Sequence, residues 1–126
     1  MAMILTDTCV MIEYLKENLE VKKTIDSIGH QSIMLNTIIV MELIIGSRNK
    51  VELNSVKKRL NNFHILEINQ EIMDAASYLI EAFCLPQGLK IPDALIAATA
   101  KYYDIPLYTL NKKDFRYMPG LNLYNY

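Results

Sequence analysis

The sequence is poor in the residues that build disulfide and zinc sites, and it carries almost no net charge. It has two cysteines and two histidines, and its formal net charge is −1 at pH 7. Cys9 and Cys84 do not have metal-ligand spacing, so we expect small buried side chains rather than a disulfide or zinc ligands. We expect His30 and His64 to be structural or surface residues. A net charge near zero gives no overall attraction to nucleic acid, so any such binding must use local basic patches or bound cations.

Long hydrophobic runs, internal repeats and linkers are also missing. No apolar run reaches the roughly 18 residues that a membrane helix needs, and no signal segment opens the chain. We therefore expect a cytoplasmic protein with no membrane partner, folded as one domain over residues 1–126. The hydrophobic fraction of 52% is nevertheless high for a small domain. Part of this apolar surface is therefore expected to contact a protein partner.

Short apolar segments alternate with segments of helical periodicity along the whole chain. We expect strands at residues 3–6, 32–35, 63–68 and 106–110, with a possible edge strand at 121–124. Helices are expected at residues 8–18, 19–28, 38–48, 52–62, 91–103 and 111–116, and a long helix from Asn69 is expected to break at Pro86 and Gly88. This alternation predicts an α/β fold with three α/β/α layers and a central parallel sheet of four to five strands.

Acidic residues recur where these strands end. Asp7 directly follows the first strand, and Glu42 lies in the second turn of the helix after the second strand. Asp93 lies in the first turn of a helix that must run antiparallel to the strands, while Asn111 and Asp114 follow the fourth strand. Ligands of parallel sheets bind beyond the carboxyl ends of the strands. The topology is therefore expected to bring these residues together.

Glu42 is the most informative of these acids. Its helical neighbours include Ile38, Ile39 and Ile45, so it occupies an apolar stripe where an unpaired carboxylate is costly. A bound cation would compensate the charge. A position at the rim of the core, or a basic partner, would do the same.

Each of the other residues also has a purely structural explanation. Asp7 can cap the first helix, and Asp93 can steady the start of the helix that Pro92 opens. Asn111 and Asp114 can form a reciprocal cap resembling a capping box. However, several carboxylates at one site repel each other unless cations lie between them. Carboxylate oxygens suit Mg²⁺ or Mn²⁺, so the set as a whole favours a metal site.

Four ordered segments carry a resemblance to a known family. They read LTDT at residues 5–8, MEL at 41–43, PDALIAA at 92–98 and YTLNKKDF at 108–115. Together they resemble the PIN-domain ribonucleases, and particularly the VapC-type toxins of bacterial toxin–antitoxin pairs. Each motif is weak alone, but the ordered set spans nearly the whole chain.

The resemblance implies a metal-dependent endoribonuclease toxin that hydrolyses RNA phosphodiester bonds with a metal-activated water. It implies three acids that hold Mg²⁺ or Mn²⁺ and a fourth position in the last motif: Asp7, Glu42 and Asp93, then Asp114, with Asn111 as the competing residue. Thr109 would be the hydroxyl residue beside this site.

The resemblance also implies partners. It implies a homodimer and a cognate antitoxin whose C-terminal segment occupies a groove beside the active site and inhibits it. For the RNA substrate, Lys112, Lys113 and Arg116 adjoin the expected site and are candidates for phosphate contact. Two alternatives stay open: a PIN-type RNA-processing nuclease without an antitoxin, and a catalytically silent domain that binds RNA or protein.

Overall fold

A parallel sheet of four strands forms the centre of the structure, a computed structural model that describes residues 2–126. The strand order is β3-β2-β1-β4, and all neighbouring strands are parallel. The strands are β1 (Ile4–Thr6), β2 (Ile33–Asn36), β3 (His64–Leu66) and β4 (Leu107–Tyr108). Every residue of β1 and β2 is buried, as expected when helices cover both faces of a parallel sheet. The predicted α/β class is confirmed.

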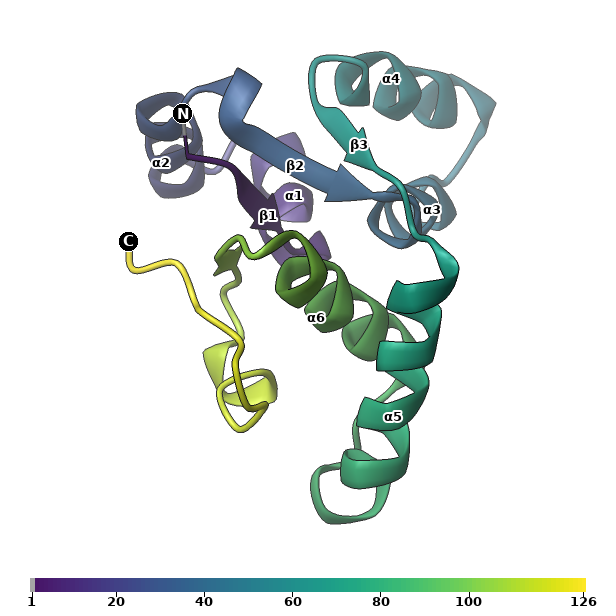
Figure 1. The fold of residues 1–126 in the computed structure, drawn as a ribbon. Coiled ribbons are helices and arrows are strands. Elements are labelled where there is room, and N and C mark those ends of the chain that lie inside the picture. The colour runs from purple at the N-terminus through teal and green to yellow at the C-terminus, as the bar shows by residue number, and fades with distance from the viewer. Residues whose placement is uncertain (1) are drawn as a thin grey trace.

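Six α-helices surround the sheet, and α5 packs along α6 at one side of it (Figure 1). The helices are α1 (Thr8–Leu15), α2 (Leu19–Ile28), α3 (Thr37–Ile45), α4 (Lys50–Leu60), α5 (Gln70–Gln87) and α6 (Ile91–Tyr103), with 3₁₀ turns η1 (His30–Ser32) and η2 (Lys112–Asp114). Over residues 2–126, no helix combines the length and the apolar character that crossing a membrane requires.

Side-chain caps fix where most of the helices begin. Asp7, Asn18, Asn36, Asn49 and Asn69 each accept a backbone N–H at the start of α1 to α5 in turn. Such caps satisfy N–H groups that have no partner within the helix. Asp7, Asn36 and Asn69 thereby start α1, α3 and α5 at or shortly after the ends of β1, β2 and β3. The cap that the sequence allows for Asp7 is confirmed.

The predicted break of α5 at Pro86 is wrong. The helix continues through Pro86 to Gln87 and ends at Gly88, whose φ of 68° is left-handed. The N–H of Gly88 donates to the Cys84 carbonyl over 3.0 Å. Pro86 is tolerated because it stands in the last turn, where its missing N–H removes a single helical bond, and the left-handed glycine is the actual stop.

Two further expectations need correction. The segment at 121–124 does not form a strand, because it joins the sheet only through an isolated bridge between Leu123 and Leu107. The expected burial of both cysteines is also wrong for Cys84, which is exposed near the end of α5, next to the exposed Leu85. Cys9 is partly buried, and both thiols are free.

Candidate active site

Four acids gather where the strands end. Asp7 immediately follows β1, Glu42 lies on α3 after β2, Asp93 lies in the first turn of α6, and Asp114 ends η2 after β4. Burial raises the pKa of Asp93 from 3.8 to about 6, and repulsion from Asp7, Asp114 and Glu42 contributes to the rise. Asp93 is therefore close enough to be repelled by each of the other three carboxylates, as the topology predicts.

Asp7 is held by hydrogen bonds on both of its carboxylate oxygens. Its Oδ1 accepts the Thr8 N–H over 2.7 Å, and its Oδ2 accepts the Thr109 hydroxyl over 2.8 Å. Cys9 Sγ also donates to Oδ2, over 3.3 Å. The side chain is only 5% exposed, and burial raises its pKa despite these bonds. The predicted cap is real, but it uses one oxygen, and the other points to the residues after β4.

Glu42 is compensated by a neighbour that the sequence did not reveal. The Thr8 hydroxyl donates to Glu42 Oε1 over 2.6 Å, which joins the start of α1 to α3. Glu42 is only partly buried, so its carboxylate lies at the rim of the core, as one of the explanations from the sequence expects. The short, charge-assisted bond holds the carboxylate there without a basic partner. Thr8 lies next to Asp7 in the sequence, but nothing in its spacing from Glu42 indicates the contact.

Cys9 is the second residue that sequence reasoning missed. Its Sγ lies 3.6 Å from the Thr109 hydroxyl and accepts the Leu110 N–H over 3.4 Å, in addition to its bond to Asp7. Burial, followed by repulsion from Asp7, raises the pKa of the thiol to about 11. At neutral pH the group is therefore a neutral thiol that links the end of β1 to the segment after β4.

Asn111 and Asp114, the two candidates for the fourth metal-binding position, have different surroundings in the structure. Asn111 makes no side-chain cap bond at η2, which argues against the capping-box alternative, and its backbone N–H donates to the Thr109 hydroxyl over 3.0 Å. Its side chain borders a surface that also includes Glu13 and Asn18. Asp114, by contrast, raises the pKa of both Asp7 and Asp93. The electrostatics favour Asp114.

Two depressions adjoin different members of this group of acids. The first, here called the Glu42 groove, lies between α1, α3 and α4 and has a volume of about 640 Å³; it is lined by Ile12, Leu15, Lys16, Glu42, Leu43, Gly46, Ser47, Arg48, Glu52, Ser55, Val56 and Arg59. The second, here called the Asp93 hollow, has a volume of about 480 Å³ and is lined by Gln87, Gly88, Leu89, Asp93, Lys113, Asp114, Arg116 and Tyr117.

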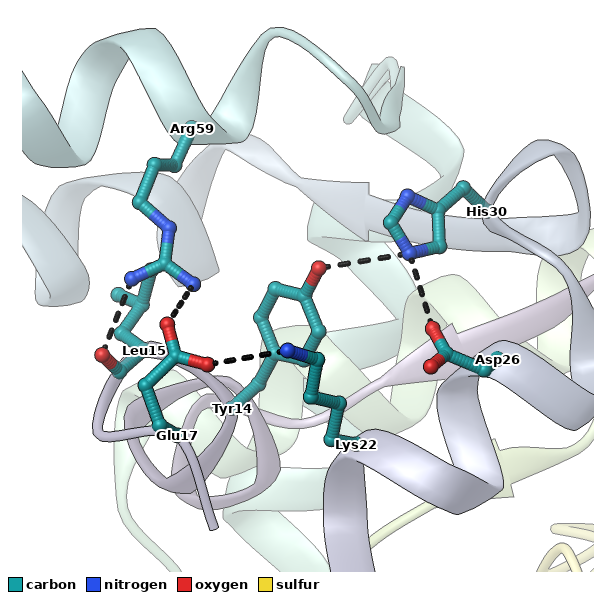
Figure 2. A network of polar contacts seen from close by, with 7 residues as sticks. All are labelled: Tyr14, Leu15, Glu17, Lys22, Asp26, His30 and Arg59. Carbon is teal, nitrogen blue, oxygen red and sulfur yellow. Dashed lines mark hydrogen bonds and ion pairs between the residues drawn. The ribbon is translucent and has the colours of Figure 1, made fainter. Parts of the chain in front are cut away.

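One wall of the Glu42 groove is fixed by Arg59 (Figure 2). Arg59 donates to the Leu15 carbonyl over 3.0 Å and to Glu17 over 3.2 Å, and its guanidinium lies 5.4 Å from the centroid of the Tyr14 ring. Lys22 pairs with the other oxygen of Glu17 over 3.3 Å. These contacts link α4 to α1 and α2, so the guanidinium of Arg59 is already bound by other parts of the protein.

The three basic residues expected to contact RNA do not share one location. Lys113 and Arg116 line the Asp93 hollow beside two of the acids. Lys112 instead places its Nζ 4.5 Å from the centroid of the Tyr126 ring. The structure therefore brings Lys113 and Arg116 to the candidate site and directs Lys112 to the C-terminal aromatic residues.

The donor set fits a hard divalent cation that keeps part of its water shell. Within residues 2–126, none of the four acids forms an ion pair with a basic side chain. Over the same range, no three His, Cys, Asp or Glu side chains lie close enough to enclose an ion on their own. Mg²⁺ typically takes one or two carboxylates and completes its shell with water and substrate phosphates. Mutually repelling carboxylates without basic partners match that requirement.

Comparison with known proteins gives a consistent result. The PIN domain family model matches residues 4–121. Ribonuclease VapC1 of Methanocaldococcus jannaschii is 31% identical over 126 residues, covering 97% of this chain and 87% of the relative. A toxin–antitoxin complex from Klebsiella pneumoniae contains a chain that superposes with a TM-score of 0.79 at 30% identity, with 94% of each chain covered. VapBC2 of Rickettsia felis, solved with a promoter DNA fragment, shares the fold with a TM-score of 0.82 at 23% identity, covering 98% of each chain.

The fold, the acids at the strand ends and the family match define a PIN domain, and this chain belongs to the PIN-domain family over nearly its whole length. Within that family its relatives are VapC-type ribonucleases. The resemblance inferred from the four short motifs is confirmed.

Proposed function

We propose that this chain is a metal-dependent endoribonuclease that acts as the toxin of a toxin–antitoxin pair. The observation that carries the proposal is the group of four mutually repelling carboxylates without basic partners, in a fold whose relatives are ribonucleases. Asp7, Glu42, Asp93 and Asp114 would hold Mg²⁺ or Mn²⁺, with Asn111 as the less favoured fourth residue. When bound, such an ion supplies an activated water and neutralises charge on the phosphodiester. An RNA substrate implies action in the cytoplasm.

The residues around the acids then have defined tasks. Thr109 and Cys9 orient Asp7, and Thr8 orients Glu42. Hydrogen bonds of this kind keep the carboxylate oxygens in place before any ligand arrives. Lys113 and Arg116 attract the phosphate backbone of RNA toward the acids and offset their negative field.

The antitoxin partner is proposed from the relatives and from the Glu42 groove. The Klebsiella pneumoniae relative is part of a toxin–antitoxin complex. In this chain the groove combines apolar side chains, including Ile12, Leu43 and Val56, with a rim of both charge signs. Such a surface suits an amphipathic peptide segment. Because Glu42 itself lines the groove, a segment bound there would cover one of the proposed metal ligands.

A homodimer is also proposed. Large apolar side chains are exposed on three helices: Ile45 of α3 is 81% exposed, Leu85 of α5 is 93% exposed and Ile91 of α6 is 66% exposed. Exposed apolar surface of this kind is used in protein contacts when it gathers into one patch. Light scattering of Ile45→Glu and Leu85→Glu variants against the unaltered chain tests this, since loss of the dimer mass is expected if either side chain lies in the interface.

The central experiment is RNA cleavage by the purified, antitoxin-free protein. Total bacterial RNA is incubated with the protein in Mg²⁺ or Mn²⁺ and in excess chelator, and new RNA ends are mapped. Asp93→Asn is expected to abolish the new ends. The matched control is Asp104→Asn, at the other end of α6, where the residue has a left-handed φ of 54° that asparagine tolerates. Undiminished cleavage in chelator or by the Asp93→Asn variant would exclude this mechanism.

A further inference from the structure

The Asp93 hollow combines both charge signs next to the proposed catalytic acids. Its walls come from two distant parts of the chain: Gln87, Gly88 and Leu89 between α5 and α6, and the segment 113–117 after β4. Within residues 2–126, the side chains of Lys113 and Arg116 take part in no ion pair. Both side chains are exposed. The hollow thus offers two cations that are not committed to the neighbouring acids.

Tyr117 adds an aromatic surface to the same hollow. Its ring is partly buried and packs edge-on against Phe83, with the ring centroids 5.0 Å apart. Burial raises the pKa of Tyr117, and Asp93 and Asp114 raise it further, so the ring lies beside these acids. Phe83 supports the ring from one side. A supported aromatic ring next to a phosphate-binding cation is the usual arrangement for stacking an unpaired base.

The remaining wall can contact the edge of such a base. Gln87 is exposed, and its amide both donates and accepts hydrogen bonds. Gly88 has no side chain, and a Cβ at this position would meet nothing within 4 Å, so the wall is open here. The volume of about 480 Å³ lies within the range of sites for small ligands.

We infer that the Asp93 hollow is a subsite for one unpaired nucleotide next to the cleaved bond. Lys113 and Arg116 hold its phosphate, Tyr117 stacks on its base, and Gln87 contacts the edge of the base. This inference rests on the proposed nuclease function and adds Tyr117 and Gln87 as residues that recognise the nucleotide, which must be unpaired at that position. A base inside a duplex has both faces covered by its neighbours and cannot stack on Tyr117.

An RNA-binding experiment tests this inference independently of catalysis. The probe is a fluorescent pool of random-sequence single-stranded RNA 12-mers, compared with the same pool annealed to its complement, with Mg²⁺ present. All proteins carry Asp7→Asn so that the probe stays intact. In this background Tyr117→Ala and a Lys113→Ala, Arg116→Ala double variant are each expected to weaken binding of the single strands about tenfold or more. Tyr117→Phe, which keeps the ring, is expected to bind like its parent.

Matched controls are Tyr78→Ala and Lys23→Ala, which remove an exposed tyrosine from α5 and an exposed lysine from α2. They are expected to leave the affinity unchanged. If Tyr117→Ala does not fold, as judged by circular dichroism, the exposed Lys113 and Arg116 carry the test. Equal affinity for duplex and single strands, or no loss in the hollow variants, overturns the subsite even if Asp93-dependent cleavage is observed. Hollow-dependent binding by a protein that cleaves no RNA would instead support the subsite and count against the nuclease.

Discussion

At the residue scale, Thr109 connects the most parts of the site. This fully buried hydroxyl donates to Asp7 and accepts the backbone N–H of Asn111, so one oxygen positions a proposed metal ligand and the loop after β4. Cys9 contacts both members of the Asp7–Thr109 pair. The geometry of the site therefore depends on the residues that orient the acids as well as on the acids themselves.

Thr109→Val tests this role because valine keeps the shape of threonine and removes the hydroxyl. The variant leaves the part-buried bond from the Asn111 N–H unmade. It also removes the buried Thr109 bond to Oδ2 of Asp7, which then keeps only its weaker contact with Cys9. We therefore expect a loss of about 1–3 kcal/mol in the free energy of unfolding. Cleavage is expected to fall, together with the affinity for Mn²⁺ measured by calorimetry. Thr109→Ser, which restores the hydroxyl, is the control. If Thr109→Val binds Mn²⁺ as tightly as the unaltered chain does, Thr109 does not position Asp7 for the metal.

Asp93 gives a prediction about pH. Its folded pKa is raised from 3.8 to about 6, so the folded protein holds this proton more tightly than the unfolded chain does. In chelator, the free energy of unfolding is therefore expected to fall as the pH rises from about 4 to about 6. Asp93→Asn removes a charge that is partly buried and repelled by the other acids, so it is expected to raise the free energy of unfolding at pH 7. The expected gain is about 1 kcal/mol, because solvent screens part of both effects.

Thermal unfolding from pH 4 to 7.5 measures this effect, with Asp104→Asn again as the control. The unaltered chain, but not Asp93→Asn, is expected to regain stability on addition of Mg²⁺. A metal-free Asp93→Asn variant that is less stable than the unaltered chain at pH 7 would show that burial of the Asp93 charge and its repulsion by the other acids do not destabilise the folded protein.

The acids could be predicted from the sequence, but their supporting residues could not. Asp7, Glu42 and Asp93 stand out because strand ends and helix starts have clear sequence signals. Thr8 and Cys9 contact residues of α3 and of the segment after β4, and no local sequence pattern identifies these contacts. Only the family resemblance indicates Thr109 as a site residue, and only the structure shows its bond to Asp7.

At the scale of elements, the sequence predicts the helix starts well because single polar residues cap them, but it does not predict the end of α5. Pro86 and Gly88 both read as helix stops in the sequence, and only the left-handed Gly88 ends the helix in the structure. The final segment reads as a strand in the sequence, yet only Leu123 pairs with the sheet. A period-2 pattern of apolar residues does not distinguish a strand from an extended segment that packs beside one.

Gly88→Ala tests the end of α5. The glycine has a φ of 68°, and an added Cβ would contact nothing within 4 Å, so the cost comes from the backbone conformation alone. We expect a loss of about 1–2 kcal/mol in the free energy of unfolding, measured by urea denaturation. Gly88→Asn is expected to lose less, because asparagine adopts the left-handed region more readily. Equal stability of Gly88→Ala and the unaltered chain would place the stop signal elsewhere.

At the scale of the whole molecule, parallel topology made the convergence of the acids predictable, because every strand end lies at one edge of the sheet. The two depressions were not predictable, because each is assembled from side chains of distant segments. Glu42 lines one depression, while Asp93 and Asp114 line the other. The proposed antitoxin segment and the proposed nucleotide subsite thus adjoin different members of the same group of acids.

This separation predicts that inhibition and cleavage can be uncoupled. Ile12 lines the Glu42 groove, is 40% exposed and contributes to neither the acids nor the Asp93 hollow. Ile12→Asp removes an apolar contact and places a carboxylate where an apolar segment is expected to bind, so affinity for the co-expressed antitoxin should fall about tenfold or more. Antitoxin-free cleavage should be unchanged. Leu19→Asp, on the exposed surface of α2 outside the groove, is the matched control. Full inhibition of Ile12→Asp by the antitoxin would mean that the inhibitory segment does not use this groove, and that the acids are covered from another side.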